Sequence, residues 1–135
     1  MTEAILKGVL VKKFRELLPD YVTLRHEDRI THGIPDISTT GDKFTSWLEV
    51  KFANPNFQSR GIQDLTLLRL ERAGSGLFIV YREYPGTHHR RTYIVNPRVI
   101  GMPMDDWKFF SEGFDHKWVI DYIKELHTHV NNNRS

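Results

Sequence analysis

Residues 33–51 read GIPDISTTGDKFTSWLEVK, and this stretch contains two expected strands that carry charged side chains. The segment 34–39 is a short strand, and Pro35 suits its beginning because proline has no amide hydrogen to donate to a sheet. The segment 44–52 alternates clearly and is a longer strand. Gly41 lies in the turn that joins them, so we expect an antiparallel pair.

The charged residues of this stretch fall on one face of the expected sheet. Side chains two apart along a strand share a face. The apolar residues at even positions from 48 to 52 therefore face the core, whereas Glu49 and Lys51 lie together on an opposite, working face. Asp36, on the preceding strand, can lie beside Glu49. Two carboxylates this close repel each other unless a cation compensates, so the arrangement suits a divalent metal with oxygen ligands.

An ordinary structural interpretation of these charges stays open from the residues alone. Glu49 and Lys51 can form a solvent-facing ion pair, and Asp36 can cap a turn. The pattern is richer than such a pair, because Gly-x-Pro-Asp is followed after 12 residues by Glu-Val-Lys within an apolar strand.

The rest of the chain predicts a mixed sheet flanked by helices, in the α/β (α+β) class. The order is one helix, three strands, a helix, two strands and a final helix, with an irregular aromatic segment before the last one. In the second helix, Ile62, Leu65 and Leu68 are expected to face the core, with Leu67 as a further candidate. The expected elements are helices at 3–18, 62–73 and 117–130, and strands at 21–26, 34–39, 44–52, 76–84 and 90–95.

Composition limits the class of protein. A chain of 135 residues fits one domain, which we place at 1–135 with a core at about 3–82, an extension at 83–130 and a tail at 131–135. The absence of cysteine excludes disulfides and thiolate metal sites, and no apolar run approaches the roughly 18–20 residues of a membrane span. We expect a cytoplasmic protein of a bacterial, archaeal or phage-infected cell. A net charge of +2 is too small to identify a nucleic-acid partner.

The motif at 33–51 resembles that of the PD-(D/E)XK nucleases. Pro35-Asp36 and Glu49-Val50-Lys51 match the defining residues, and the order of elements agrees with the restriction-endonuclease-like αβββαβ core. Gly-x-Pro-Asp, Glu-Val-Lys and Gln63 at the start of the next helix are most similar to archaeal-type and phage Holliday-junction resolvases and to VRR-NUC domains. The resemblance covers about residues 3–82.

The resemblance implies a role for each matching residue. Asp36 would bridge one or two Mg²⁺ ions, with Glu49 and the Val50 carbonyl as further ligands and Mn²⁺ as a substitute metal. Lys51 would hold or help deprotonate the attacking water. The family also uses a glutamate from the first helix, for which Glu3 is our choice and Glu16 the alternative.

Gln63 would orient water or contact the scissile phosphate, although an ordinary place in the first turn of a helix is nearly as good an interpretation.

We therefore expect a homodimeric, Mg²⁺-dependent endonuclease of DNA recombination and repair that resolves four-way junctions by paired cuts. The alternatives are a VRR-NUC-type or restriction-like nuclease that acts on flaps or duplex DNA, and a DNA-binding module without catalysis.

Basic side chains that cluster outside the motif are candidates for contacts with DNA phosphates. They lie on the first helix, before the Asp36 strand, around the second helix and at an expected hairpin tip. The candidates are Lys12, Lys13, Arg25, Arg29, Arg60, Arg69, Arg72, His88, His89, Arg90 and Arg91.

The aromatic residues of 102–114 belong either to a second small core or to a dimer interface.

Overall fold

The structure is a computed structural model that describes residues 1–27, 34–56 and 62–133, apart from the side chains of 62–65. Its sheet has six strands whose order in space is their order along the chain. The strands are β1 (Val22–Arg25), β2 (Ile37–Thr40), β3 (Thr45–Ala53), β4 (Gly76–Glu83), β5 (Arg90–Val95) and β6 (Phe110–Glu112). The α-helices are α1 (Glu3–Leu17), α2 (Ile62–Arg72) and α3 (His116–Asn132). The expected mixed sheet flanked by helices is confirmed.

The sheet is mixed because one connection crosses over. Strands β1, β2 and β3 form an antiparallel meander, whereas β3 and β4 are parallel and are joined through α2. Parallel neighbours require such a long connection, which is why a helix lies between these two strands. Strands β5 and β6 then continue the sheet in antiparallel fashion.

Polar side chains cap the two long helices at their first turns. The Thr2 hydroxyl accepts a hydrogen bond from the Ile5 amide at 3.2 Å, and the Asp115 carboxylate accepts one from the Trp118 amide at 3.0 Å. These contacts satisfy amides that have no partner inside the helix. None of the helices in the described ranges is long and apolar enough to cross a membrane.

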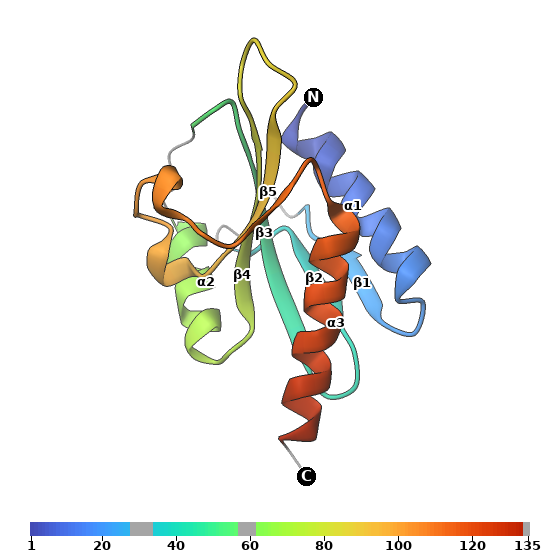
Figure 1. Cartoon of the computed structure of the whole chain (residues 1–135). Helices are drawn as coiled ribbons and strands as arrows, with labels where there is room; N and C mark the ends of the chain where they lie inside the picture. Colours follow the sequence, from blue (N-terminus) through green and yellow to red (C-terminus); the bar gives the residue numbers. More distant parts are fainter. Residues whose placement is uncertain (28–33, 57–61, 134–135) are drawn as a thin grey trace.

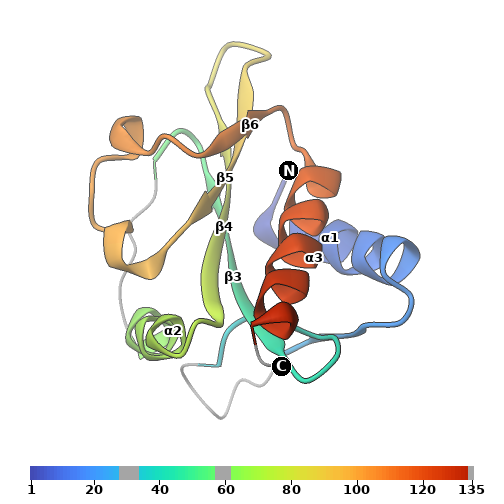
Figure 2. The same cartoon turned by 60° about the horizontal axis from the view of Figure 1, so that its bottom comes forward.

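The sheet has a hydrophobic core on each face. Figure 2 shows α1 and α3 on one side of the sheet and α2 on the other. The first core joins α1 and α3 to residues such as Leu48 and Val50 of β3, and the second joins Leu67 of α2 to Phe78 and Val80 of β4. The face of β3 that was expected to be open is therefore largely covered.

The segment between β5 and α3 is more ordered than the sequence indicates. It contains two short 3₁₀ helices, η1 (Pro97–Val99) and η2 (Met104–Asp106), and the edge strand β6. Trp107 is 6% exposed within the second core, and its indole nitrogen donates to the Val99 carbonyl at 3.2 Å. Trp107 therefore belongs to a second core, which is one of the two interpretations that the sequence allowed. Phe109, in contrast, is 49% exposed and lies against Trp118 and Tyr122.

Candidate active site

The two carboxylates of the motif lie side by side because of the β2–β3 register. Ile37 faces Leu48 across this antiparallel pair, so Asp36, one residue earlier, faces Glu49, one residue later. The Asp36 carbonyl accepts a hydrogen bond from the His26 amide at 2.7 Å, which holds the backbone at the point where β2 begins. The fold of three adjacent strands therefore fixes the spacing of the pair.

Both oxygens of the Asp36 carboxylate have donors. Lys7 Nζ, from α1, lies 2.8 Å from Oδ1, and the Val50 amide donates to Oδ2 at 2.9 Å. Burial opposes ionisation of Asp36, but hydrogen bonds with Glu49, Lys7 and Val50 outweigh it and lower the pKa of this carboxyl. Asp36 is therefore the ionised member of the pair.

Glu49 is in the opposite situation. The residue is 1% exposed, and neither carboxylate oxygen receives a hydrogen bond from a donor in the described part of the chain. Lys51 Nζ is 3.9 Å from Oε2, which makes a loose ion pair. Burial and the adjacent Asp36 carboxyl raise the pKa of Glu49 to about 9. Without a further cation, Glu49 keeps its proton at neutral pH.

This geometry fits a divalent cation with oxygen ligands. Protonated Glu49 can share its proton with Asp36, but when Glu49 is ionised its two buried oxygens have no donor among the described residues, and a hard cation beside Asp36 would satisfy them. Among the residues that the structure describes, no group of three or more histidine, aspartate or glutamate side chains could hold a metal ion. The described side chains thus offer two carboxylates, and Mg²⁺ commonly retains several waters in such sites.

The first-helix acids do not join this pair. Glu3 is exposed, because it lies one turn before Leu6, where the buried residues of α1 begin. Glu3 therefore lies outside the buried part of α1, and its role as a ligand stays a prediction. Glu16 is also exposed, and its carboxylate pairs with Lys13 at 3.5 Å.

The roles expected for two other residues of the site, Gln63 and Val50, remain predictions. Gln63 lies in the first turn of α2, but its side chain is outside the described residues. The Val50 amide points toward Asp36, and a strand residue directs its amide and carbonyl to the same side, so the Val50 carbonyl also faces β2.

Lys7 belongs to the site, and the residue pattern of the motif does not reveal it. Its side chain is 18% exposed, and its ammonium group meets Asp36 across 29 positions of sequence. The sequence does place Lys7 next to the buried stripe of α1. Lys7 directly follows Leu6 and lies three residues before Leu10, and both leucines are buried. The sequence alone does not show which strand end this stripe covers.

The basic candidates for DNA contact separate into groups with different surroundings. Lys12 and Arg25 line a shallow depression on α1 together with Gly8 and Arg15, and Arg25 pairs with Glu27 at 2.8 Å. Lys13, Arg69 and Arg72 are exposed on the two helices. Arg29 and Arg60 lie outside the described residues.

The hairpin between β4 and β5 projects beyond the sheet, as Figure 1 shows, and acidic neighbours pair with its basic residues. Arg90 Nη2 lies 3.1 Å from Glu83, and Arg91 Nε lies 3.5 Å from Glu112. His89 is also close to Glu112, at 3.7 Å, whereas His88 is exposed. These ion pairs reduce the net positive charge that the hairpin presents to a polyanion.

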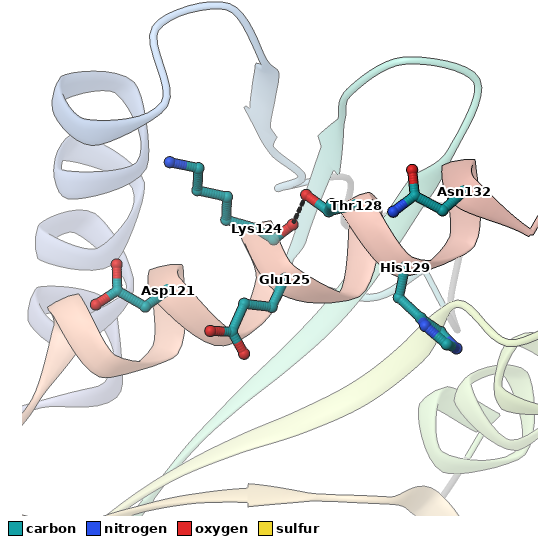
Figure 3. Close-up of a pocket in the computed structure, with 6 residues that line it drawn as sticks. All are labelled: Asp121, Lys124, Glu125, Thr128, His129 and Asn132. Atoms are coloured by element: carbon teal, nitrogen blue, oxygen red, sulfur yellow. Dashed lines mark hydrogen bonds between the residues drawn. The ribbon is translucent and has the colours of Figure 1, made fainter.

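A second depression, on the outer surface of α3, does not resemble a catalytic site. Figure 3 shows its side chains along the helix with Asp121, Glu125 and Lys124 pointing in different directions. The Thr128 hydroxyl donates to the Lys124 carbonyl at 3.0 Å, which is a contact within the helix itself. The mixed charges at this surface do not converge on a common point.

No protein-family model and no curated protein matches the chain. Among solved structures, the chain is similar to Hjc, a Holliday junction resolvase from the archaeal hyperthermophile Archaeoglobus fulgidus. The two share 12% sequence identity with a TM-score of 0.49, and the match covers 85% of this chain and 92% of the other. The functional inference therefore depends on the side chains of the site.

Proposed function

We propose that the protein is a metal-dependent endonuclease that hydrolyses phosphodiester bonds in DNA. The observation that carries this proposal is the Asp36–Glu49 pair, which is held between Lys7 and Lys51. When Glu49 is ionised, its two buried oxygens have no donor within the described ranges, and a bound cation would satisfy them. The resemblance of Gly-x-Pro-Asp and Glu-Val-Lys to the PD-(D/E)XK motif supports the same chemistry.

The residues of the site have distinct tasks in this reaction. Asp36 and Glu49 would hold a divalent ion, Mg²⁺ or Mn²⁺, which when bound supplies a water nucleophile at neutral pH and stabilises charge on the phosphate. Lys51 Nζ, 3.9 Å from Glu49, is placed to donate to the attacking water or to a phosphate oxygen. The Val50 amide keeps one Asp36 oxygen oriented, so the carboxylate needs little reorganisation when substrate arrives.

The proposed substrate is branched DNA, most specifically a four-way junction cut by a homodimer. The support is the likeness of Gly-x-Pro-Asp, Glu-Val-Lys and Gln63 to junction resolvases. Two symmetric cuts in one junction follow naturally from a twofold dimer. Flap and duplex cutting are the competing specificities within the same chemistry.

A cleavage panel tests the function. Purified protein is incubated with a synthetic four-way junction, a flap and a linear duplex, each with Mg²⁺, with Mn²⁺ or with EDTA. We expect the junction to be cut with either metal ion and to stay intact in EDTA. Asp36→Asn and Lys51→Ala should each lower the cleavage rate by about 100-fold or more, because each removes a group that acts on the reacting atoms.

Binding measurements separate catalysis from folding. Both variants should keep their affinity for the junction within a few-fold in a gel-shift assay with Ca²⁺, and their circular dichroism should match that of the original protein. Binding without cutting by the unaltered, metal-loaded protein would instead identify a DNA-binding module. Preferential cutting of flaps or duplex would leave the nuclease chemistry intact and replace the junction as substrate.

A further inference from the structure

Lys7 differs from the other lysines of α1 in its surroundings. Lys12 and Lys13 are exposed, whereas Lys7 and its partner Asp36 have side chains that are 18% and 14% exposed. The distance of 2.8 Å between Lys7 Nζ and Asp36 Oδ1 is that of a charge-assisted hydrogen bond. A pair this shielded is screened less by salt than a pair at the surface. Lys7 is thus a fixed part of the carboxylate site.

The four titratable side chains balance one another once Glu49 has lost its proton to bind a cation. Two ionised carboxylates, Asp36 and Glu49, then stand against two ammonium groups, Lys7 and Lys51. One divalent cation would leave a surplus of two positive charges. This surplus matches a phosphodiester whose negative charge increases as it is attacked. A second divalent cation would double that surplus with only these two described carboxylates to hold it.

The position of Lys7 also bears on how many ions can bind. Each Asp36 oxygen accepts one hydrogen bond and keeps further acceptor capacity, so one ion can bind at Oδ2 beside the Val50 amide, whereas a second ion bridged by Asp36 would have to approach Oδ1 beside the Lys7 ammonium group. The ammonium group therefore stands where a second cation would need to be, and like charges at such distances repel strongly when partly shielded from water.

We propose that Lys7 is a positioning residue that holds Asp36 and takes the place of a second metal ion, so that each chain binds one divalent cation. The inference rests on the proposed function, because it assigns the metal stoichiometry of that same site. It adds to the motif a residue from α1 that is basic, where the resemblance implies an acid.

Metal titration without DNA tests this role directly. Metal-free protein is titrated with Mn²⁺, and free Mn²⁺ is measured by electron paramagnetic resonance to obtain stoichiometry and affinity. We expect one ion per chain in the original protein. Lys7→Met should bind Mn²⁺ more tightly, on the order of tenfold, because a neighbouring positive charge is removed. Lys7→Glu should bind two ions, since it adds a carboxylate beside Asp36.

Lys124→Met is the matched control, because Lys124 is exposed on α3 and lies outside the site. Its Mn²⁺ affinity should equal that of the original protein. Lys7→Arg should keep a single ion, since it retains the positive charge. If circular dichroism shows that Lys7→Met does not fold, the number of Mn²⁺ ions bound per chain by the original protein and by Lys7→Arg decides whether the site holds one ion.

Two ions bound to the original chain, or equal affinities for Lys7→Met and Lys124→Met, would overturn the role of Lys7. In that case, metal-dependent cutting of DNA would leave the proposed function standing. One bound ion and a tighter Lys7→Met, but no cutting of any DNA, would uphold Lys7 and remove the nuclease. Absence of Mn²⁺ binding would overturn both.

Discussion

At the scale of single residues, the structure contains two buried titratable side chains with atoms that lack partners in the described ranges, Glu49 and His127. Their surroundings indicate different roles for the two side chains. Glu49 lies beside Asp36 and Lys51, where a ligand can reach a charged cluster. His127 is fully buried between the rings of Tyr21 and Phe44, and its Nε2 is 2.8 Å from the Ser46 hydroxyl. The histidine is therefore a structural group, in spite of its contact with a serine.

His127 should make stability depend on pH. Burial lowers the pKa of His127 to about 4, whereas an unfolded histidine titrates near 6.5. Between these values His127 binds more protons in the unfolded chain, so its contribution to stability falls as pH decreases from 6.5 to 4, by up to about 3 kcal/mol, whereas Glu49, whose pKa is raised, contributes in the opposite direction. Urea unfolding of the original protein and of His127→Gln at pH 7 and pH 4.5 isolates the contribution of His127.

His127→Gln should lose less stability, or gain more, between pH 7 and pH 4.5 than the original protein does, because glutamine does not titrate. The exposed His129 provides the control, and His129→Gln should leave the dependence unchanged. Equal pH slopes for the original protein and His127→Gln would show that other groups determine the acid sensitivity.

At the scale of elements, local patterns predicted most helices and strands. The meander, the crossover through α2 and the buried strand β4 were all visible as periodicity and turns. The inward face of α2 was less clear, because Leu67, the additional candidate, is fully buried whereas Leu68 is only partly buried. Strand β6 has three residues, Phe110–Glu112, and so short a strand carries almost no periodic signal. It exists because it pairs with β5, which local sequence does not encode.

The site was predictable to the extent that it lies on neighbouring strands. Asp36, Glu49 and Lys51 come together through one turn and the alternation of a strand. The burial of Glu49 was missed, because α2 and its core cover a face that looked polar in sequence. Lys7 was missed because its contact depends on how α1 packs against the sheet.

Gly76 should be essential for the contact between α2 and β4. A Cβ atom there would lie 2.7 Å from the Leu67 carbonyl and 2.9 Å from the Leu70 Cβ, so helix and strand approach too closely for any side chain. We expect Gly76→Ala to lower the free energy of unfolding by about 2 kcal/mol, as overpacking does. Urea unfolding provides the measurement.

Gly101→Ala is the control for this substitution, since nothing lies within 4 Å of a Cβ built there. It should change stability by less than about 0.5 kcal/mol, as substitutions at open surface positions do. Equal losses for the two alanine variants would show that α2 can move away from β4 at little cost.

At the scale of the whole molecule, positive charge is distributed unevenly among the candidate DNA contacts. Lys12 lies in the depression on α1 and makes no ion pair with another described residue, whereas Arg90 pairs with Glu83 at 3.1 Å. A polyanion gains most from a cation that has no competing partner. The surface of α1 is therefore better suited to phosphate contact than the base of the hairpin.

Salt dependence of binding should distinguish these two surfaces. In an Asp36→Asn background that prevents cutting, Lys12→Ala should reduce the slope of log affinity against log salt by about one. Arg90→Ala should have a smaller effect, because Glu83 already offsets its charge. Fluorescence anisotropy with a labelled junction measures both, and Lys124→Ala serves as the control. A larger effect of Arg90→Ala than of Lys12→Ala would reverse this assignment.

The first core joins two helices that are far apart in the chain, and this has a consequence for synthesis on the ribosome. Every pair of adjacent strands in the described sheet is consecutive in sequence, so the meander can form while the chain emerges. Leu6 and Leu10 of α1, however, share their core with Ile120 and Ile123 of α3. Until α3 emerges, that apolar face of the nascent sheet stays open to chaperones and proteases. Truncated chains that lack α3 should therefore be degraded faster than the full chain.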